Sequence, residues 1–119
     1  MSRSDGATIP EGLLAAEALA DVQGPLASAR TLPPAAYTDP RVYEVEKARV
    51  FAGAWMPVAR VEQLPERGDY LCLTLVDQPI MVVRGRRDGE IRVMSRVCLH
   101  RAVPIIDGCG NRTHFTCPY

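Results

Sequence analysis

The sequence has no excess of charge of one sign and no long hydrophobic run. Its 14 Lys and Arg residues balance 14 Asp and Glu residues in a chain of 119, so there is no net basic field to hold a nucleic-acid backbone. The longest apolar stretch, 71–83, is broken by polar residues and is far shorter than the roughly 20 residues that cross a bilayer. We therefore expect no nucleic-acid partner and no membrane-spanning segment.

A secretion signal is also lacking. The Ala- and Leu-rich N-terminal stretch has no basic start and is interrupted by Glu11, Glu17 and Asp21, whereas a signal peptide needs an unbroken apolar centre. We therefore expect a cytoplasmic protein, in which cysteines stay reduced and bind metals more often than they form disulfides. The chain has four cysteines, at positions 72, 98, 109 and 117. No glycine-rich phosphate loop, nucleophile elbow or pair of carboxylates stands out.

The N-terminal part of the chain favours helices. Residues 1–38 have the pattern of a leader, with a short helix over 11–22 followed by an extended arm. A second helix, over 39–54, is better marked, because Asp39 is a good N-cap and the proline after it suits the first helical position. This helix is expected to lead into a domain that spans 39–119.

After the second helix the apolar residues alternate with a period of two, which is typical of strands. The expected strands are 55–61, 69–76, 80–84 and 91–97. Asp77-Gln78 and Asp88-Gly89 mark turns between them, and Trp55 is expected in the core. Antiparallel strands joined by tight turns predict a mainly β fold, a small antiparallel β-sandwich or barrel preceded by a helical segment.

The motif with the most chemical content lies at the end of the chain. Cys98 and His100 are separated by one residue, and residues 101–116 separate them from Cys117. This pattern resembles the Rieske iron–sulfur motif, in which Cys-x-His is followed after about 15–17 residues by Cys-x-x-His. The resemblance implies that Cys98 and Cys117 bind one iron of a [2Fe–2S] cluster and that His100 binds the other. The fourth ligand would be a histidine directly after Tyr119, where the sequence stops.

The resemblance covers roughly residues 31–119 and is to the α subunits of Rieske non-heme iron oxygenases. It implies a truncated Rieske domain, at the N-terminal end of a longer chain, that relays electrons from a ferredoxin or reductase. In that family a mononuclear Fe(II) in a C-terminal domain activates O2, and an organic substrate is hydroxylated or dealkylated. The subunits form homotrimers, with or without β subunits. The fragment alone is expected to be inactive.

Other functions stay open from the residues alone. A stand-alone Rieske ferredoxin would carry electrons without an oxygenase domain, although such proteins generally lack the helix over 39–54. A zinc-stabilised binding module would take tetrahedral ligands from Cys98, His100, Cys109, His114 and Cys117. Otherwise we expect Cys109 in a turn, His114 in solvent and Cys72 as a small buried apolar side chain. The arginines between 84 and 101 are expected to face solvent, or else to dock an acidic electron donor.

Overall fold

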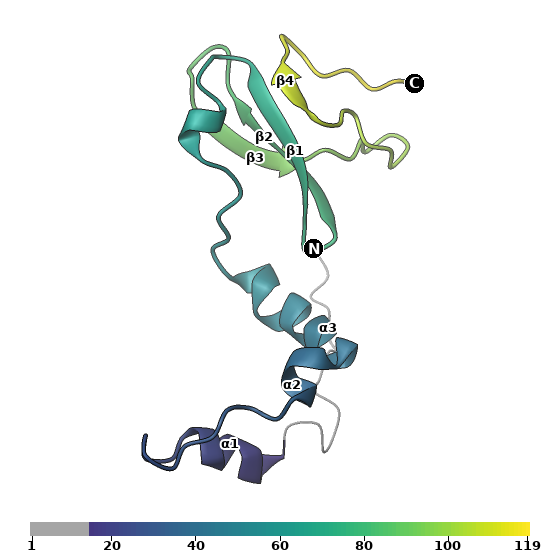
Figure 1. Cartoon of the computed structure of the whole chain (residues 1–119). Helices are drawn as coiled ribbons and strands as arrows, with labels where there is room; N and C mark the ends of the chain where they lie inside the picture. Colours follow the sequence, from purple (N-terminus) through teal and green to yellow (C-terminus); the bar gives the residue numbers. More distant parts are fainter. Residues whose placement is uncertain (1–14) are drawn as a thin grey trace. The chain divides into compact units, whose positions relative to one another are not determined.

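The computed structural model describes residues 15–119, and the chain divides after Trp55 into two compact units. The first residues of the helix expected over 11–22 lie outside the described part, within which helix α1 spans Ala16–Val22. Nowhere in residues 15–119 is a helix long and apolar enough to cross a membrane. The fold is mainly antiparallel β with a few short helices, which confirms the predicted class (Figure 1).

The first unit is helical. Helix α2 (Ala35–Thr38) forms where the extended arm was predicted, because the carbonyl groups of two prolines accept its first N–H groups. Helix α3 (Pro40–Arg49) begins as predicted at Asp39, whose carboxylate accepts the backbone N–H of Arg41 at 2.9 Å. It ends at Arg49, earlier than predicted, with Val50 as its C-cap, and a 3-10 turn, η1 (Phe51–Gly53), follows.

The second unit is a four-stranded antiparallel sheet in the order β3–β2–β1–β4 (Figure 1). Its strands are β1 (Asp69–Leu75), β2 (Gln78–Arg84), β3 (Ile91–Ser95) and β4 (Cys109–Asn111). The central strand β2 is the most buried, and it forms the core of this unit with Tyr70 and Leu64. At one edge, every residue of β3 is exposed. The first three strands form where the alternating pattern predicts them.

The stretch from Trp55 into the start of the second unit differs from the prediction. Trp55 is fully exposed and does not pack in the core, and residues 55–61 form no strand. Pro57 lies in this stretch and has no N–H to donate to a sheet, which disfavours a strand there. A 3-10 turn, η2 (Val61–Gln63), forms instead, and the side chain of Gln63 accepts the backbone N–H of Arg60 at 2.8 Å.

Val76 and Asp77 form the two-residue turn between β1 and β2, one residue earlier than the predicted turn. Leu75 pairs directly with Gln78 across it. The φ angles of Val76 and Asp77 are 48° and 62°, which are the positive values of a type I′ turn. A β-branched residue is strained in this region, because its side chain collides with the adjacent backbone.

Replacing Val76 with asparagine is therefore expected to raise the free energy of unfolding by about 1 kcal/mol, because asparagine accepts positive φ far better than valine. Urea denaturation followed by circular dichroism measures this change. Val93→Asn is the matched control, because Val93 is half exposed in β3 and lies in ordinary strand backbone. The control is expected to destabilise the sheet. A Val76→Asn protein that unfolds at a lower urea concentration than wild type would contradict the strain argument.

Candidate metal centre

The first ligand loop (residues 98–103) follows β3 and carries Cys98 and His100. The backbone N–H of Cys98 donates to the carbonyl of Val103, and that of Ala102 donates to the carbonyl of Cys98, each at 2.8 Å. These two bonds close the loop on itself. Ala102 adopts a φ of 52°, a left-handed conformation that glycine takes more readily. The loop is therefore tight, and it holds Cys98 and His100 close together.

Cys117 lies in the second ligand loop (residues 112–119), which follows β4. Two residues before Cys117, the ring of Phe115 packs edge-on against the buried ring of Tyr70, with centroids 5.3 Å apart. Two residues after it, the ring of Tyr119 lies 5.3 Å from the guanidinium of Arg101 in the first ligand loop. This cation–π contact joins the two ligand loops. No local sequence pattern marks either contact, because both depend on residues brought together by the sheet.

The two loops bring all three predicted ligand side chains together. The Sγ atoms of Cys98 and Cys117 are 3.3 Å apart, and Nδ1 of His100 is 4.0 Å from Sγ of Cys117. All three donor atoms lie within 4.8 Å of one another. Both cysteines are half-buried, whereas His100 is exposed. Within residues 15–119, this is the one group of three or more His, Cys, Asp or Glu side chains whose donor atoms converge in this way.

The backbone around Cys98 favours its ionised form. The N–H of His100 points at Sγ of Cys98 across 3.4 Å, and this contact lowers the pKa of the Cys98 thiol, with a further contribution from the Cys117 side chain. A thiolate is the form of cysteine that binds a metal. The loop thus provides a donor that is already biased toward metal binding.

The donor set fits a metal that prefers sulfur and imidazole ligands. Two thiolates bound at about 2.3 Å to one tetrahedral metal are about 3.8 Å apart, so Cys98 and Cys117 would need to separate only slightly from 3.3 Å. The imidazole of His100 can then serve the same metal or an adjacent one. Zinc and iron–sulfur clusters both use these donors, so the geometry supports a metal centre of either kind.

The other residues considered for a zinc site lie elsewhere. Cys109 is exposed in β4, opposite Leu71 of β1, and not in the predicted turn. His114 is exposed as predicted, and its Nδ1 is 2.9 Å from Oγ1 of Thr113. Cys72 is half-buried, and burial raises the pKa of its thiol. A four-ligand zinc site made from Cys109 or His114 is therefore not formed in the described residues.

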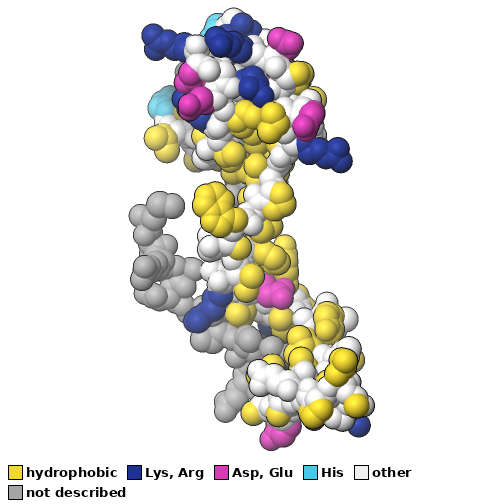
Figure 2. Space-filling model, turned by 90° about the vertical axis from the view of Figure 1, so that its left-hand side faces the viewer, with side chains coloured by type: hydrophobic (Ala, Val, Ile, Leu, Met, Phe, Trp, Pro, Cys, Tyr) yellow, Lys and Arg dark blue, Asp and Glu magenta, His cyan; other side chains and the backbone are white. Residues whose placement is uncertain are grey.

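The arginines between 84 and 101 do not form one free basic face. Arg84 donates to the carbonyls of Leu64 and Gly89, and Arg96 to the carbonyl of Ile106 and the carboxylate of Asp107. In Figure 2, basic side chains (dark blue) lie among acidic ones (magenta) on the viewed face of the sheet unit. These contacts disfavour the idea that the whole arginine group docks an acidic partner.

Comparison with known proteins gives one consistent match. A family model described as the Rieske [2Fe-2S] domain matches residues 54–119. The chain is 41% identical over 90 residues to biphenyl 2,3-dioxygenase subunit alpha of Rhodococcus jostii (strain RHA1), covering 74% of this chain and 19% of that subunit. It is 38% identical over 90 residues to the carnitine monooxygenase oxygenase subunit of Escherichia coli (strain K12), covering 75% of this chain and 24% of that subunit.

Solved structures agree with these relatives. A naphthalene 1,2-dioxygenase from Rhodococcus sp. bound to indole superposes with a TM-score of 0.75 at 37% identity, covering 87% of this chain and 22% of that one. The apo form of a quaternary ammonium Rieske monooxygenase superposes with a TM-score of 0.69 at 34% identity, covering 75% of this chain and 26% of that one. The chain therefore spans only about a fifth to a quarter of the proteins it matches.

Proposed function

The chain belongs to the Rieske [2Fe–2S] domain family, and we propose that Cys98, His100 and Cys117 are three of the ligands of its cluster. The observation that carries this proposal is the convergence of their three donor atoms within 4.8 Å, at the spacing of the family's motif. Cys98 and Cys117 would bind one iron and His100 the other. A histidine directly after Tyr119 is the proposed fourth ligand in the whole protein.

The types of ligand determine how easily such a centre accepts an electron. When bound, the cluster supplies one-electron transfer at a potential of about −150 to +300 mV. Cys98 and Cys117 bring two negative charges as thiolates, whereas a neutral His100 brings none. Four thiolates would bring twice that negative charge and would oppose the arrival of an electron. The mixed donor set therefore suits a relay that accepts electrons readily.

We propose that the whole protein is the α subunit of a Rieske oxygenase. The chain covers 19% and 24% of two such relatives, a biphenyl dioxygenase and a carnitine monooxygenase. In the proposed protein, electrons pass from this domain to a mononuclear Fe(II) in a further domain, where an organic substrate is hydroxylated or dealkylated with O2. Residues 15–119 would then supply the electron relay and not the oxygenation site.

The proposal extends to partners and location. The electron donor would be a ferredoxin or a reductase, and the whole protein would assemble as a homotrimer, with or without β subunits, like its proposed family. A cytoplasmic location fits the requirement that the ligand thiols stay reduced until the cluster is inserted.

Iron, zinc and acid-labile sulfide analysis of the full-length protein tests this proposal. Two labile sulfides per chain, accompanied by the electron paramagnetic resonance (EPR) signal of a reduced two-iron cluster, are the expected result, because a zinc site contains no sulfide. One zinc per chain without sulfide would show instead that the site belongs to a zinc-stabilised binding module. A full-length chain with a cluster but no further iron site would identify an electron carrier rather than an oxygenase.

A further inference from the structure

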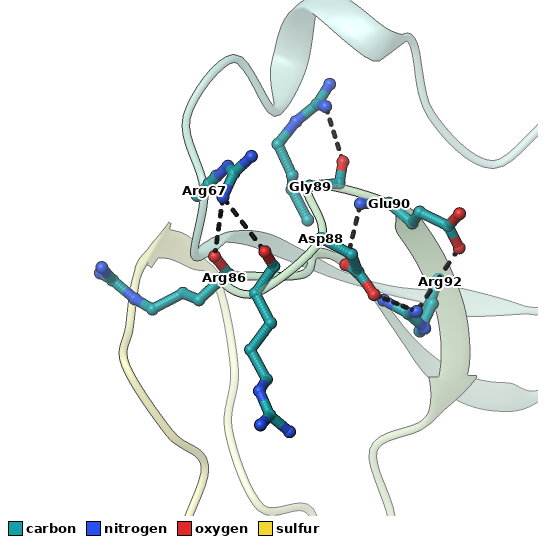
Figure 3. Close-up of polar contacts among 8 residues, drawn as sticks. Arg67, Arg86, Asp88, Gly89, Glu90 and Arg92 are labelled. Carbon is teal, nitrogen blue, oxygen red and sulfur yellow. Dashed lines mark hydrogen bonds and ion pairs between the residues drawn. The ribbon is translucent and has the colours of Figure 1, made fainter.

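Three residues from distant parts of the sheet unit are linked in a closed ring of hydrogen bonds between their side chains and one another's side chains or backbone carbonyls. The first is Arg67, in the loop before β1. Its Nη1 donates to the carbonyls of Arg86 and Arg87, at 3.4 and 3.2 Å, in the hairpin between β2 and β3 (Figure 3). This contact fixes the hairpin against the loop that precedes β1.

The second side chain is Arg86, in that hairpin. Its Nε donates to the carbonyl of Arg112 at 3.1 Å, and its Nη2 donates to Oδ1 of Asn111. Asn111 ends β4, and Arg112 begins the second ligand loop. A guanidinium that makes two such bonds fixes direction as well as distance. The hairpin is thus tied to the point where the chain leaves the sheet toward Cys117.

The third side chain, Asn111, closes the ring. Its Nδ2 donates to the carbonyl of Arg67 at 3.2 Å and to Oδ1 of Asp69 at 2.8 Å. The bond from Asn111 is the main reason that the pKa of Asp69 is lowered. We call the side chains of Arg67, Arg86 and Asn111 the three-segment lock, because each reaches a different segment and together they join all three.

Gly68 shows how closely these segments approach. Its φ is 93°, and a Cβ at this position would lie 2.7 Å from the carbonyl oxygen of Arg112 and 2.7 Å from Nε of Arg86. The backbone N–H of Arg112 also donates to the carbonyl of Gly68 at 2.9 Å. Only glycine leaves room for this contact. The lock is therefore a built feature of the unit and not a chance surface contact.

We propose that Arg86 and Asn111 are positioning residues for the cluster ligand Cys117, an inference that rests on the proposed function. Strand β4 has three exposed residues and, among residues 15–119, pairs with β1 alone, so its own pairing holds it weakly. Residues 112–116 alone separate Asn111 of the lock from Cys117. The lock thus sets where the second ligand loop begins, and through it the distance between Cys117 and Cys98.

The test uses the full-length protein loaded with its cluster. Asn111→Ala removes the bonds of Asn111 to both Arg86 and Arg67, Arg86→Gln removes the bonds of Arg86 to Asn111 and Arg112, and Arg86→Lys keeps the charge with fewer donors. Arg92→Gln is the matched control, because Arg92 lies at the same hairpin and pairs with Asp88 at 2.6 Å, with no contact to β4 in the described residues (Figure 3). Cluster loss to excess iron chelator is followed by visible absorption, and the reduced cluster by EPR at low temperature.

Asn111→Ala and Arg86→Gln are expected to lose the cluster about tenfold faster than wild type, because each removes two or more hydrogen bonds. Their EPR spectra are expected to change, and Arg86→Lys should lie between wild type and Arg86→Gln. Arg92→Gln is expected to stay within about twofold of wild type, because an exposed ion pair contributes little.

Three results would overturn the inference. The first is cluster loss at the wild-type rate in Asn111→Ala and Arg86→Gln. The second is equal acceleration by the control. The third is a lower unfolding temperature with an unchanged EPR spectrum, since that is what a purely structural role predicts. A wild-type protein without labile sulfide is a different result, which refutes the proposed function itself and leaves the lock with no cluster to position.

Discussion

Replacing Cys98 or Cys117 with serine is expected to abolish the visible absorption of the cluster in the full-length protein. The two Sγ atoms lie 3.3 Å apart and are the proposed sulfur donors of the site. A serine hydroxyl is a harder, poorly ionised donor that does not replace a thiolate on iron. Loss of either sulfur leaves an iron with an incomplete set of protein ligands. Absorption spectra of the purified variants, together with sulfide analysis, measure the effect.

Cys109→Ser is the matched control for this prediction. Cys109 lies between the two ligand cysteines in the sequence, but it is exposed in β4 and outside the converging group. Its spectrum is expected to match that of the wild type. A Cys98→Ser or Cys117→Ser protein with the wild-type spectrum, or a Cys109→Ser protein without a cluster, would refute the ligand assignment.

Replacing His100 with cysteine is expected to lower the reduction potential by on the order of 200 mV. The exchange of a neutral imidazole for a thiolate adds one negative charge, which opposes the arrival of an electron. The size follows from the gap between Rieske centres, at about −150 to +300 mV, and plant-type clusters with four cysteines, at about −400 mV. His100→Cys replaces one of the two histidine ligands expected in the whole protein, so the reduction potential should fall by about half of that difference. Redox titration monitored by EPR measures the potential.

The control for His100 is His114→Cys. His114 lies in the same stretch of chain but is exposed, and its ring contacts Thr113. A new cysteine there is expected to leave the potential unchanged. A His100→Cys protein that assembles a cluster at the wild-type potential would show that His100 is not a ligand, and the charge argument would then not apply to this site.

Local patterns in the sequence predicted the parts of the fold that depend on local chemistry. The cap at Asp39 and the alternation in β1, β2 and β3 place those elements correctly. The predicted strand over 55–61 was wrong, because Pro57 has no N–H for a sheet. Strand β4 was missed, because Cys109 stands between two glycines and becomes a strand only through pairing with β1.

The candidate site, like the fold, could be predicted only in part from the sequence. The spacing of Cys98, His100 and Cys117 predicted that they are ligands, which stays a prediction, and the structure places their donor atoms within 4.8 Å of one another. The contacts at the start of the second ligand loop could not be predicted, because Arg86 donates to a backbone carbonyl and to an asparagine far away in the sequence. A backbone carbonyl or an asparagine that becomes an acceptor only after folding cannot be recognised from the sequence. The exposure of Trp55 was missed for a related reason, since an aromatic residue is usually buried.

The exposed edge strand β3 matters for the tendency of the chain to aggregate before any metal is bound. A strand with unpaired backbone groups is a template for other chains during synthesis, when many copies are close together. Arg92 lies in β3 between Ile91 and Val93 and keeps a charge on that edge. Arg92 is ion-paired with Asp88 and Glu90, so a second copy that approached along β3 would have to remove water from charged side chains of both signs. The charged side chains at β3 thus oppose aggregation of the newly made chain before its metal is bound.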